Sequence, residues 1–110
     1  MLMLQRITAG HLERLSEQQK QKLRSWWVPQ EGEYIFFSGQ EEMIYYLSGV
    51  EKRRSLPLLS IGLMMAYVAQ QGHTLTVDSV CEEWVVRLSG FEAKASELCD
   101  ALWDVMISIL

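Results

Sequence analysis

The chain has 110 residues, of which 49% are hydrophobic and 22% are charged. This length fits one domain, and this balance excludes an intrinsically disordered chain, which needs low hydrophobicity and high net charge. The net charge is −4, and residues 55–110, with seven acidic and two basic residues, account for −5. Phosphate backbones bind clustered positive charge, so nucleic acid is an unlikely partner and a basic protein surface a better one. We predict a single domain spanning residues 1–110.

Two short helices are expected at the start of the chain. Thr8 can cap a first helix that runs through Leu15. Ser16, followed three residues later by Gln19, forms a capping box that predicts the start of a second helix. Pro29 would end this second helix, because proline cannot continue a helical interior.

The next segment predicts a β-hairpin and a loop. Residues 34–38 and 43–47 are rich in aromatic and β-branched side chains, and they flank a connection at residues 38–42 that contains a glycine. Their apolar residues are contiguous, which indicates that both faces of the ribbon are partly covered. Residues 48–55 are polar and basic, and we expect a loop there.

Residues 56–72 predict a helix that is apolar on most sides, as in a central, buried helix, and that ends at a glycine. Residues 74–77 and 83–88 have the composition of strands, with Asp78-Ser79 as the turn between them. For residues 74–82, we leave open both a strand and a helical turn.

From Phe91 onward, apolar residues recur with a period of 3.6 and predict an amphipathic helix of about four turns. The chain ends on apolar residues, so we expect this end to pack against the domain or against a second copy. The residues that could mediate this self-association are Trp103, Ile109 and Leu110.

The order of elements predicts an α+β fold: a small antiparallel sheet, made of a hairpin plus one or two further strands, packed against about four helices. No run of apolar residues reaches the roughly 20 residues needed to cross a bilayer, and Arg6 and Glu13 interrupt any secretory signal. We therefore expect a cytoplasmic protein without a membrane partner, in which Cys81 and Cys99 are reduced and buried.

Four aromatic residues are candidates for a partner-binding surface. Adjacent helical residues point about 100° apart, so Trp26 and Trp27 cannot both face one core, and one of them is expected to be exposed. Tryptophan is over-represented among the residues that dominate binding energy. The candidate set is Trp26, Trp27, Tyr45 and Tyr46.

Six basic residues could form a second surface if the second helix and the following loop meet. Basic residues beside aromatic ones are typical of single-strand binding, which makes a nucleic-acid-binding accessory factor one alternative. The candidate basic patch consists of Lys20, Lys22, Arg24, Lys52, Arg53 and Arg54.

Catalytic and metal-binding patterns are weak. The only histidines are His11 and His73, and no residues have the spacing of metal ligands, so we expect no metal and no cofactor. His73 precedes Cys81 by eight residues and could activate it across a hairpin, but a buried structural thiol is the favoured interpretation. A small enzyme with an unrecognised site is a further alternative, with no catalytic residue assigned.

Three motifs occur together: WVPQEGE at residues 27–33, LPLLSIGLMM at residues 56–65 and ELCDALWDVM at residues 97–106. With this spacing, the chain resembles a group of small uncharacterised proteins of phages and prophages of Gram-positive bacteria. The resemblance implies a phage or prophage accessory protein that works inside a bacterial cell, and it carries over no functional residue. The favoured function is a non-enzymatic protein-interaction module that binds an unknown protein or a second copy of itself.

Overall fold

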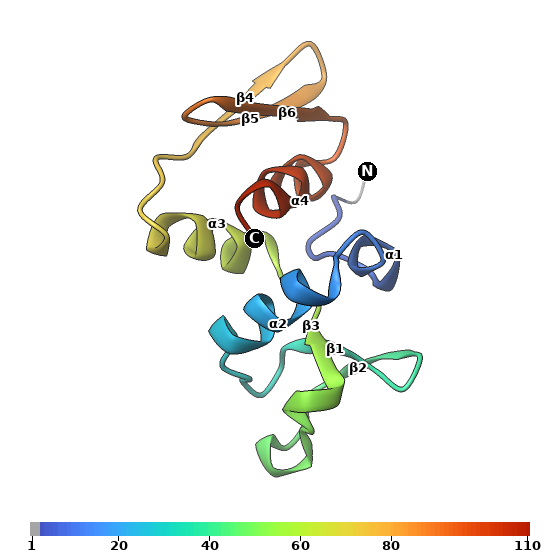
Figure 1. Cartoon of the computed structure of the whole chain (residues 1–110). Coiled ribbons are helices and arrows are strands. Elements are labelled where there is room, and N and C mark those ends of the chain that lie inside the picture. The colour runs from blue at the N-terminus through green and yellow to red at the C-terminus, as the bar shows by residue number, and fades with distance from the viewer. Residues whose placement is uncertain (1–2) are drawn as a thin grey trace. The chain divides into compact units, whose positions relative to one another are not determined.

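The computed structural model describes residues 3–110 and contains two compact units (Figure 1). Residues 8–58 form one, here called the middle unit, and residues 3–7 together with 59–110 form the other, the terminal unit. Each unit contains two α-helices and a three-stranded antiparallel sheet. The α+β class is therefore confirmed, with strands in two small sheets where the sequence predicted one. The single-domain assignment stays a prediction.

The middle unit begins with α1 (Ala9–Leu12) and α2 (Glu17–Trp26). The predicted capping box of α2 is confirmed: Ser16 Oγ accepts from Gln19 N at 3.1 Å, and Gln19 Oε1 accepts from Ser16 N at 2.9 Å. These two bonds satisfy donors that have no partner inside the helix. The helix ends at Trp26, before the predicted proline stop.

The sheet of the middle unit has the order β2-β1-β3, with β1 at Tyr34–Phe37, β2 at Gln40–Met43 and β3 at Ser55–Pro57. Ser38 and Gly39 have φ of 51° and 78° and connect β1 to β2. Positive φ at both residues is the conformation of a two-residue hairpin turn whose twist matches that of the strands. The hairpin is confirmed, but its second strand starts three residues earlier than predicted.

Two short 3-10 helices, η1 (Leu47–Gly49) and η2 (Lys52–Arg54), occupy the predicted loop before β3. One cluster of buried side chains in the middle unit consists of Trp27, Ile35 and Ile44. Partly buried hydrophobic residues pack against this cluster: Trp26, Phe37 and Val50.

The terminal unit contains α3 (Ile61–Gln70), whose N-cap Ser60 accepts a bond from Leu63 N at 3.1 Å. α3 therefore starts five residues after the predicted start at residue 56, because Leu56 and Pro57 belong to β3. The prediction of a central helix buried on most sides was also wrong: α3 buries Met64, Tyr67 and Val68, whereas Met65 is exposed.

The second sheet is a meander of order β4-β5-β6, with β4 at Thr76–Val80, β5 at Glu83–Leu88 and β6 at Phe91–Ala95. Within residues 74–82, which the sequence left open, residues 76–80 form a strand, and the predicted Asp78-Ser79 turn was wrong because both residues lie in that strand. Cys81 and Glu82 form the turn, with φ of 51° and 65°. The chain from Phe91 is also a strand rather than the start of the last helix.

The last helix, α4 (Leu98–Ile109), lies between the β4-β5-β6 sheet and α3, and it packs against β5, β6 and α3 (Figure 1). Its apolar face supplies most of the core of the terminal unit: Leu98, Cys99, Ala101, Leu102, Trp103, Val105 and Met106 are all buried. Within residues 3–110, no helix is long and apolar enough to span a membrane.

Candidate functional site: an aromatic segment and a basic hollow

The structure separates the four aromatic candidates into core and surface. Trp27 is 2% exposed, and its indole Nε1 lies 3.4 Å from Glu33 Oε1, so its polar atom has a partner although the ring is buried. Trp26 is half-buried and packs against the same cluster. Trp27 is therefore a core residue, and Trp26 is the tryptophan of the pair that keeps some surface.

Tyr45, Tyr46 and Leu47 are 69%, 75% and 48% exposed, and we call these three consecutive residues the aromatic segment. The segment follows β2, in the green part of the chain in Figure 1. The residue before it, Ile44, is buried and bonded on both backbone atoms: its N donates to Glu33 O and its O accepts from Gly32 N, each at 2.8 Å. A fixed residue thus leads directly into three outward-facing apolar side chains.

This exposure follows from where the hairpin turn lies. The sequence placed both tyrosines in the second strand, where alternate residues would face the core. Because the turn uses only two residues, β2 ends at Met43 and the tyrosines fall beyond it. Their side chains leave the sheet instead of covering it.

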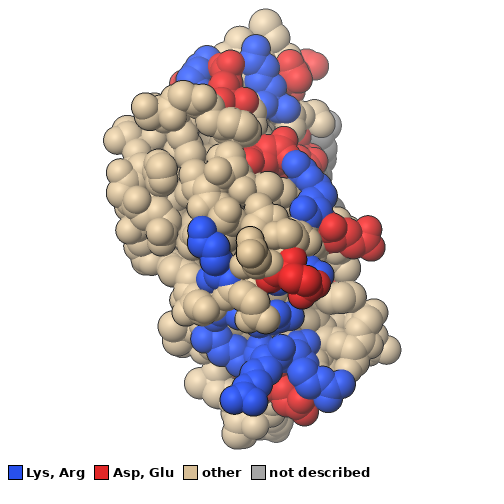
Figure 2. Space-filling model, viewed as in Figure 1, with Lys and Arg blue, Asp and Glu red and all other residues tan. Residues whose placement is uncertain are grey.

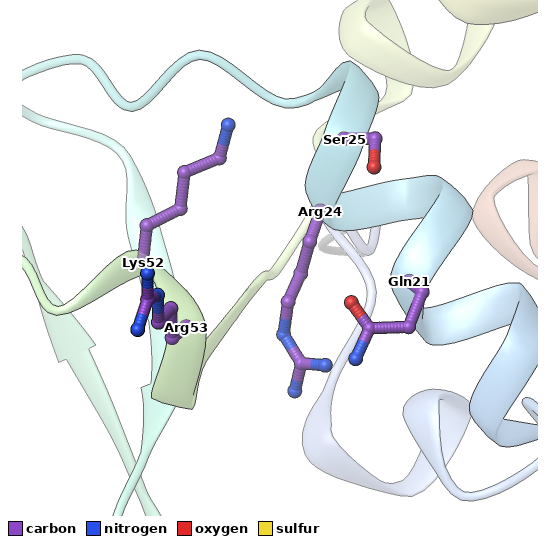
Figure 3. A pocket seen from close by; sticks show the side chains of 5 residues that line it. All are labelled: Gln21, Arg24, Ser25, Lys52 and Arg53. Carbon is purple, nitrogen blue, oxygen red and sulfur yellow. The ribbon is translucent and has the colours of Figure 1, made fainter.

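A second feature is a hollow of about 430 Å³ between α2 and η2. We call it the basic hollow. Figure 2 shows lysine and arginine side chains gathered on this part of the middle unit, and Figure 3 shows the side chains that line the hollow from the two elements. They are Gln21, Arg24 and Ser25 of α2, and Lys52 and Arg53 of η2.

Arg24 is the best-fixed residue of the basic hollow. Its Nε donates to Ser55 O at 3.0 Å, and Ser55 is fully buried, with Oγ donating to Glu51 O at 2.8 Å. This chain of bonds ties α2 to β3 and holds the guanidinium in place between α2 and η2 (Figure 3). The amide end of Gln21 points toward the same guanidinium.

The remaining basic candidates lie outside the hollow. Lys20 Nζ lies 3.3 Å from Glu17 Oε1. Arg54 pairs with Glu51 at 3.5 Å and lies 5.6 Å from the centroid of the Phe37 ring. Lys22 is exposed and does not line the hollow. Helix and loop therefore meet as the predicted patch required, but three of its six members line the hollow.

The residues considered for self-association differ in exposure. Trp103 is fully buried among the residues of α4, whereas Ile109 and Leu110 are half-buried. A buried indole has no side-chain surface to offer a second copy, so Trp103 is explained by its place in the core.

The two cysteines have different environments, and both are free. Cys99 is buried as predicted, and burial, together with the charges of Asp100 and Glu97, raises the pKa of its thiol to about 12. Cys81 is exposed, so the prediction that it is buried was wrong, because it occupies the β4–β5 turn. His73 precedes β4, whose five residues span about 16 Å at about 3.3 Å per residue. The proposed Cys–His pair is therefore not formed.

One hydroxyl–imidazole contact was missed by sequence reasoning. Nδ1 of His11 accepts from the backbone N–H of Thr8 at 3.0 Å and lies 3.0 Å from Thr8 Oγ1. This pair closes the first turn of α1, a capping role that a histidine three residues after threonine could have suggested. Across residues 3–110, no group of three or more metal-ligating side chains is suitable for an ion.

Comparison with known proteins adds no assignment: no protein-family model, no curated protein and no solved structure matches the chain. The two surfaces described above are therefore interpreted from their own chemistry.

Proposed function

We propose that the chain is a non-enzymatic protein-interaction module that binds another protein through the aromatic segment. The observation that carries this proposal is the exposure of three consecutive large apolar side chains, Tyr45, Tyr46 and Leu47. Tyrosine is enriched in protein interfaces because its ring buries a large area while its hydroxyl still forms hydrogen bonds. Ile44, which is anchored in the core, fixes one end of the segment and lowers the entropy lost on binding.

The partner we propose has an apolar depression with an acidic rim. Lys52 and Arg53 follow the aromatic segment closely in the chain and are exposed, so acidic groups on the partner would complement them. Association with a second copy of the chain is the alternative. The burial of Trp103 argues against a dimer through α4.

The cellular setting is also a proposal. We infer from the three motifs at residues 27–33, 56–65 and 97–106 that the chain is a phage or prophage accessory protein that acts in the bacterial cytoplasm. A small protein of this kind can modulate a host protein by occupying its surface.

A nucleic-acid-binding accessory factor is the second candidate. The observation in its favour is the convergence of Arg24, Lys52 and Arg53 on one hollow. Enzymatic function has less support, because the one cysteine that is exposed lies at the opposite end of β4 from His73.

Photo-crosslinking tests the proposal. The photoreactive amino acid benzoylphenylalanine would replace Tyr46 and, as a matched control, Phe91, an exposed aromatic residue of β6. In bacterial cells that express the chain, we expect a discrete adduct from position 46 that is absent from position 91 and weakened by Tyr45→Ser.

Three results would contradict the proposal. The absence of an adduct at position 46, or equal adducts at both positions, would show that the aromatic segment is not a specific surface. An adduct with twice the mass of the chain would assign the segment to self-association instead.

A further inference from the structure

The basic hollow contains three positive charges without a carboxylate partner. Among the ion pairs within residues 3–110, none involves Arg24, Lys52 or Arg53, whereas the neighbouring Lys20 and Arg54 each pair with a glutamate. Like charges gathered around one hollow repel each other, and an anion bound among them relieves that repulsion. The unmatched charge therefore points to a ligand.

All side chains that line the hollow can donate hydrogen bonds. Arg24 and Arg53 provide guanidinium groups, Lys52 an ammonium, and Gln21 and Ser25 an amide and a hydroxyl. Arg24 is already held by its bond to Ser55 O, so it loses little freedom when an anion binds. Guanidinium groups match the geometry of phosphate oxygens with paired bonds.

The size of the hollow and its surroundings favour a compact anion over a polymer. A volume of about 430 Å³ lies within the range of pockets that hold small ligands. The middle unit has seven basic and seven acidic residues and thus no net charge to attract a polyanion from a distance. Glu17, one turn before Gln21, and Glu51, beside Lys52, would repel an extended phosphate backbone.

We propose that the basic hollow binds a phosphate monoester, with Arg24, Lys52 and Arg53 contacting the phosphate oxygens. Gln21 and Ser25 donate to the same group or to the alcohol it esterifies. This inference goes beyond the proposed function, because it concerns a small anion in the basic hollow and requires no protein partner, although Lys52 and Arg53 also lie close to the aromatic segment in the chain. Failure of the crosslinking experiment would leave it unaffected, and the reverse also holds.

Titration of phenyl phosphate into the 15N-labelled full chain, followed by NMR, tests the proposal. We expect saturable shifts that are largest at the amides of Gln21, Ser25, Lys52 and Arg53. A variant with Lys52→Gln and Arg53→Gln should bind at least about tenfold more weakly, because two charge-assisted contacts are lost. Lys22→Gln makes a single charge change on α2 outside the hollow and should alter affinity by no more than about twofold.

Several results would overturn the inference. One is a titration that does not saturate, and another is equal affinity in the double variant and the native chain. Tighter binding of a single-stranded oligonucleotide or an acidic peptide at the same salt concentration would assign the hollow to that ligand instead. Lys52 and Arg53 are exposed, so the double variant should keep the native spectrum outside the hollow, and this unchanged spectrum is the folding control.

Discussion

Replacing Trp27 by alanine should destabilise the protein far more than replacing Tyr46 by alanine, although the sequence assigned both residues to one candidate surface. Trp27 is 2% exposed and packs with Ile35 and Ile44. A large aromatic side chain buries about 150–250 Å². At about 25 cal/mol per Å² this corresponds to roughly 4–6 kcal/mol. Alanine retains part of that area, so we expect a loss of about 3–5 kcal/mol for Trp27→Ala.

Tyr46 is 75% exposed, so Tyr46→Ala should change the free energy of unfolding by no more than about 0.5 kcal/mol. Urea unfolding followed by far-UV circular dichroism measures both values, and the slope m reports whether the unfolded states are comparable. Trp27→Phe, which keeps a ring in the core, should show an intermediate loss and remain measurable if the alanine variant is already partly unfolded.

A loss of more than about 2 kcal/mol for Tyr46→Ala, a value typical of buried residues, would contradict this prediction. Tyr46 would then be required for the fold and could not be a free binding surface. A loss of less than about 1 kcal/mol for Trp27→Ala would equally contradict its place in the core.

Three further predictions concern the cysteines and the turn at Cys81. A thiol reagent should modify one cysteine in the native chain and both in urea, because Cys81 is exposed and Cys99 is buried; two fast-reacting thiols in the native chain would contradict this. Burial holds the pKa of Cys99 at about 12, above the ordinary value of 9.0 expected in the unfolded chain. The raised pKa of Cys99 makes a contribution to the free energy of unfolding that is fully present below pH 9.0. This contribution is lost as the pH rises toward 12, by up to about 1.4 kcal/mol per pH unit. The pH dependence of urea unfolding should therefore be flatter for Cys99→Ala, and an unchanged slope would exclude this role. Cys81 and Glu82 both have positive φ, so Cys81→Asn with Glu82→Gly should stabilise the protein by about 1 kcal/mol. A lower melting temperature would contradict that assignment.

The features that could be predicted from the sequence are those that depend on residues close together in the chain. The capping box of Ser16 and Gln19 lies within four residues, and the structure forms both of its bonds. The periodic apolar face from Leu98 onward likewise identified α4. Because both features are set by neighbouring residues, they can be predicted before the tertiary structure is known.

Strand positions were harder to predict because pairing overrides propensity. β2 consists of Gln40–Met43, a polar edge strand, whereas the apolar residues that follow it had the composition of a strand. In β6, the spacing from Phe91 to Ala95 also fits a helical face, which hid the strand. A two-residue turn fixed the register in the first case, and its backbone conformation was not evident in Ser38-Gly39.

The candidate basic patch could also be predicted only in part, because its arrangement depends on contacts between residues far apart in the chain. The sequence identified six basic residues but could not show which of them have carboxylate partners. Arg24 lines the hollow because its Nε bonds Ser55 O, 31 positions away. Arg54 turns to Glu51 and the Phe37 ring instead. Which basic residues line the hollow therefore depends on the packing of α2 against β3, which is a tertiary contact.

We propose that the aromatic segment is open to a different protein rather than occupied by a second copy. Light scattering of the full chain, beside a variant with Tyr45→Ser and Tyr46→Ser, distinguishes these two states. We predict a monomer of 12.7 kDa for the native chain and the same state for the variant. A native dimer that the two serine substitutions dissociate would contradict the claim, because the segment would then be the interface between copies.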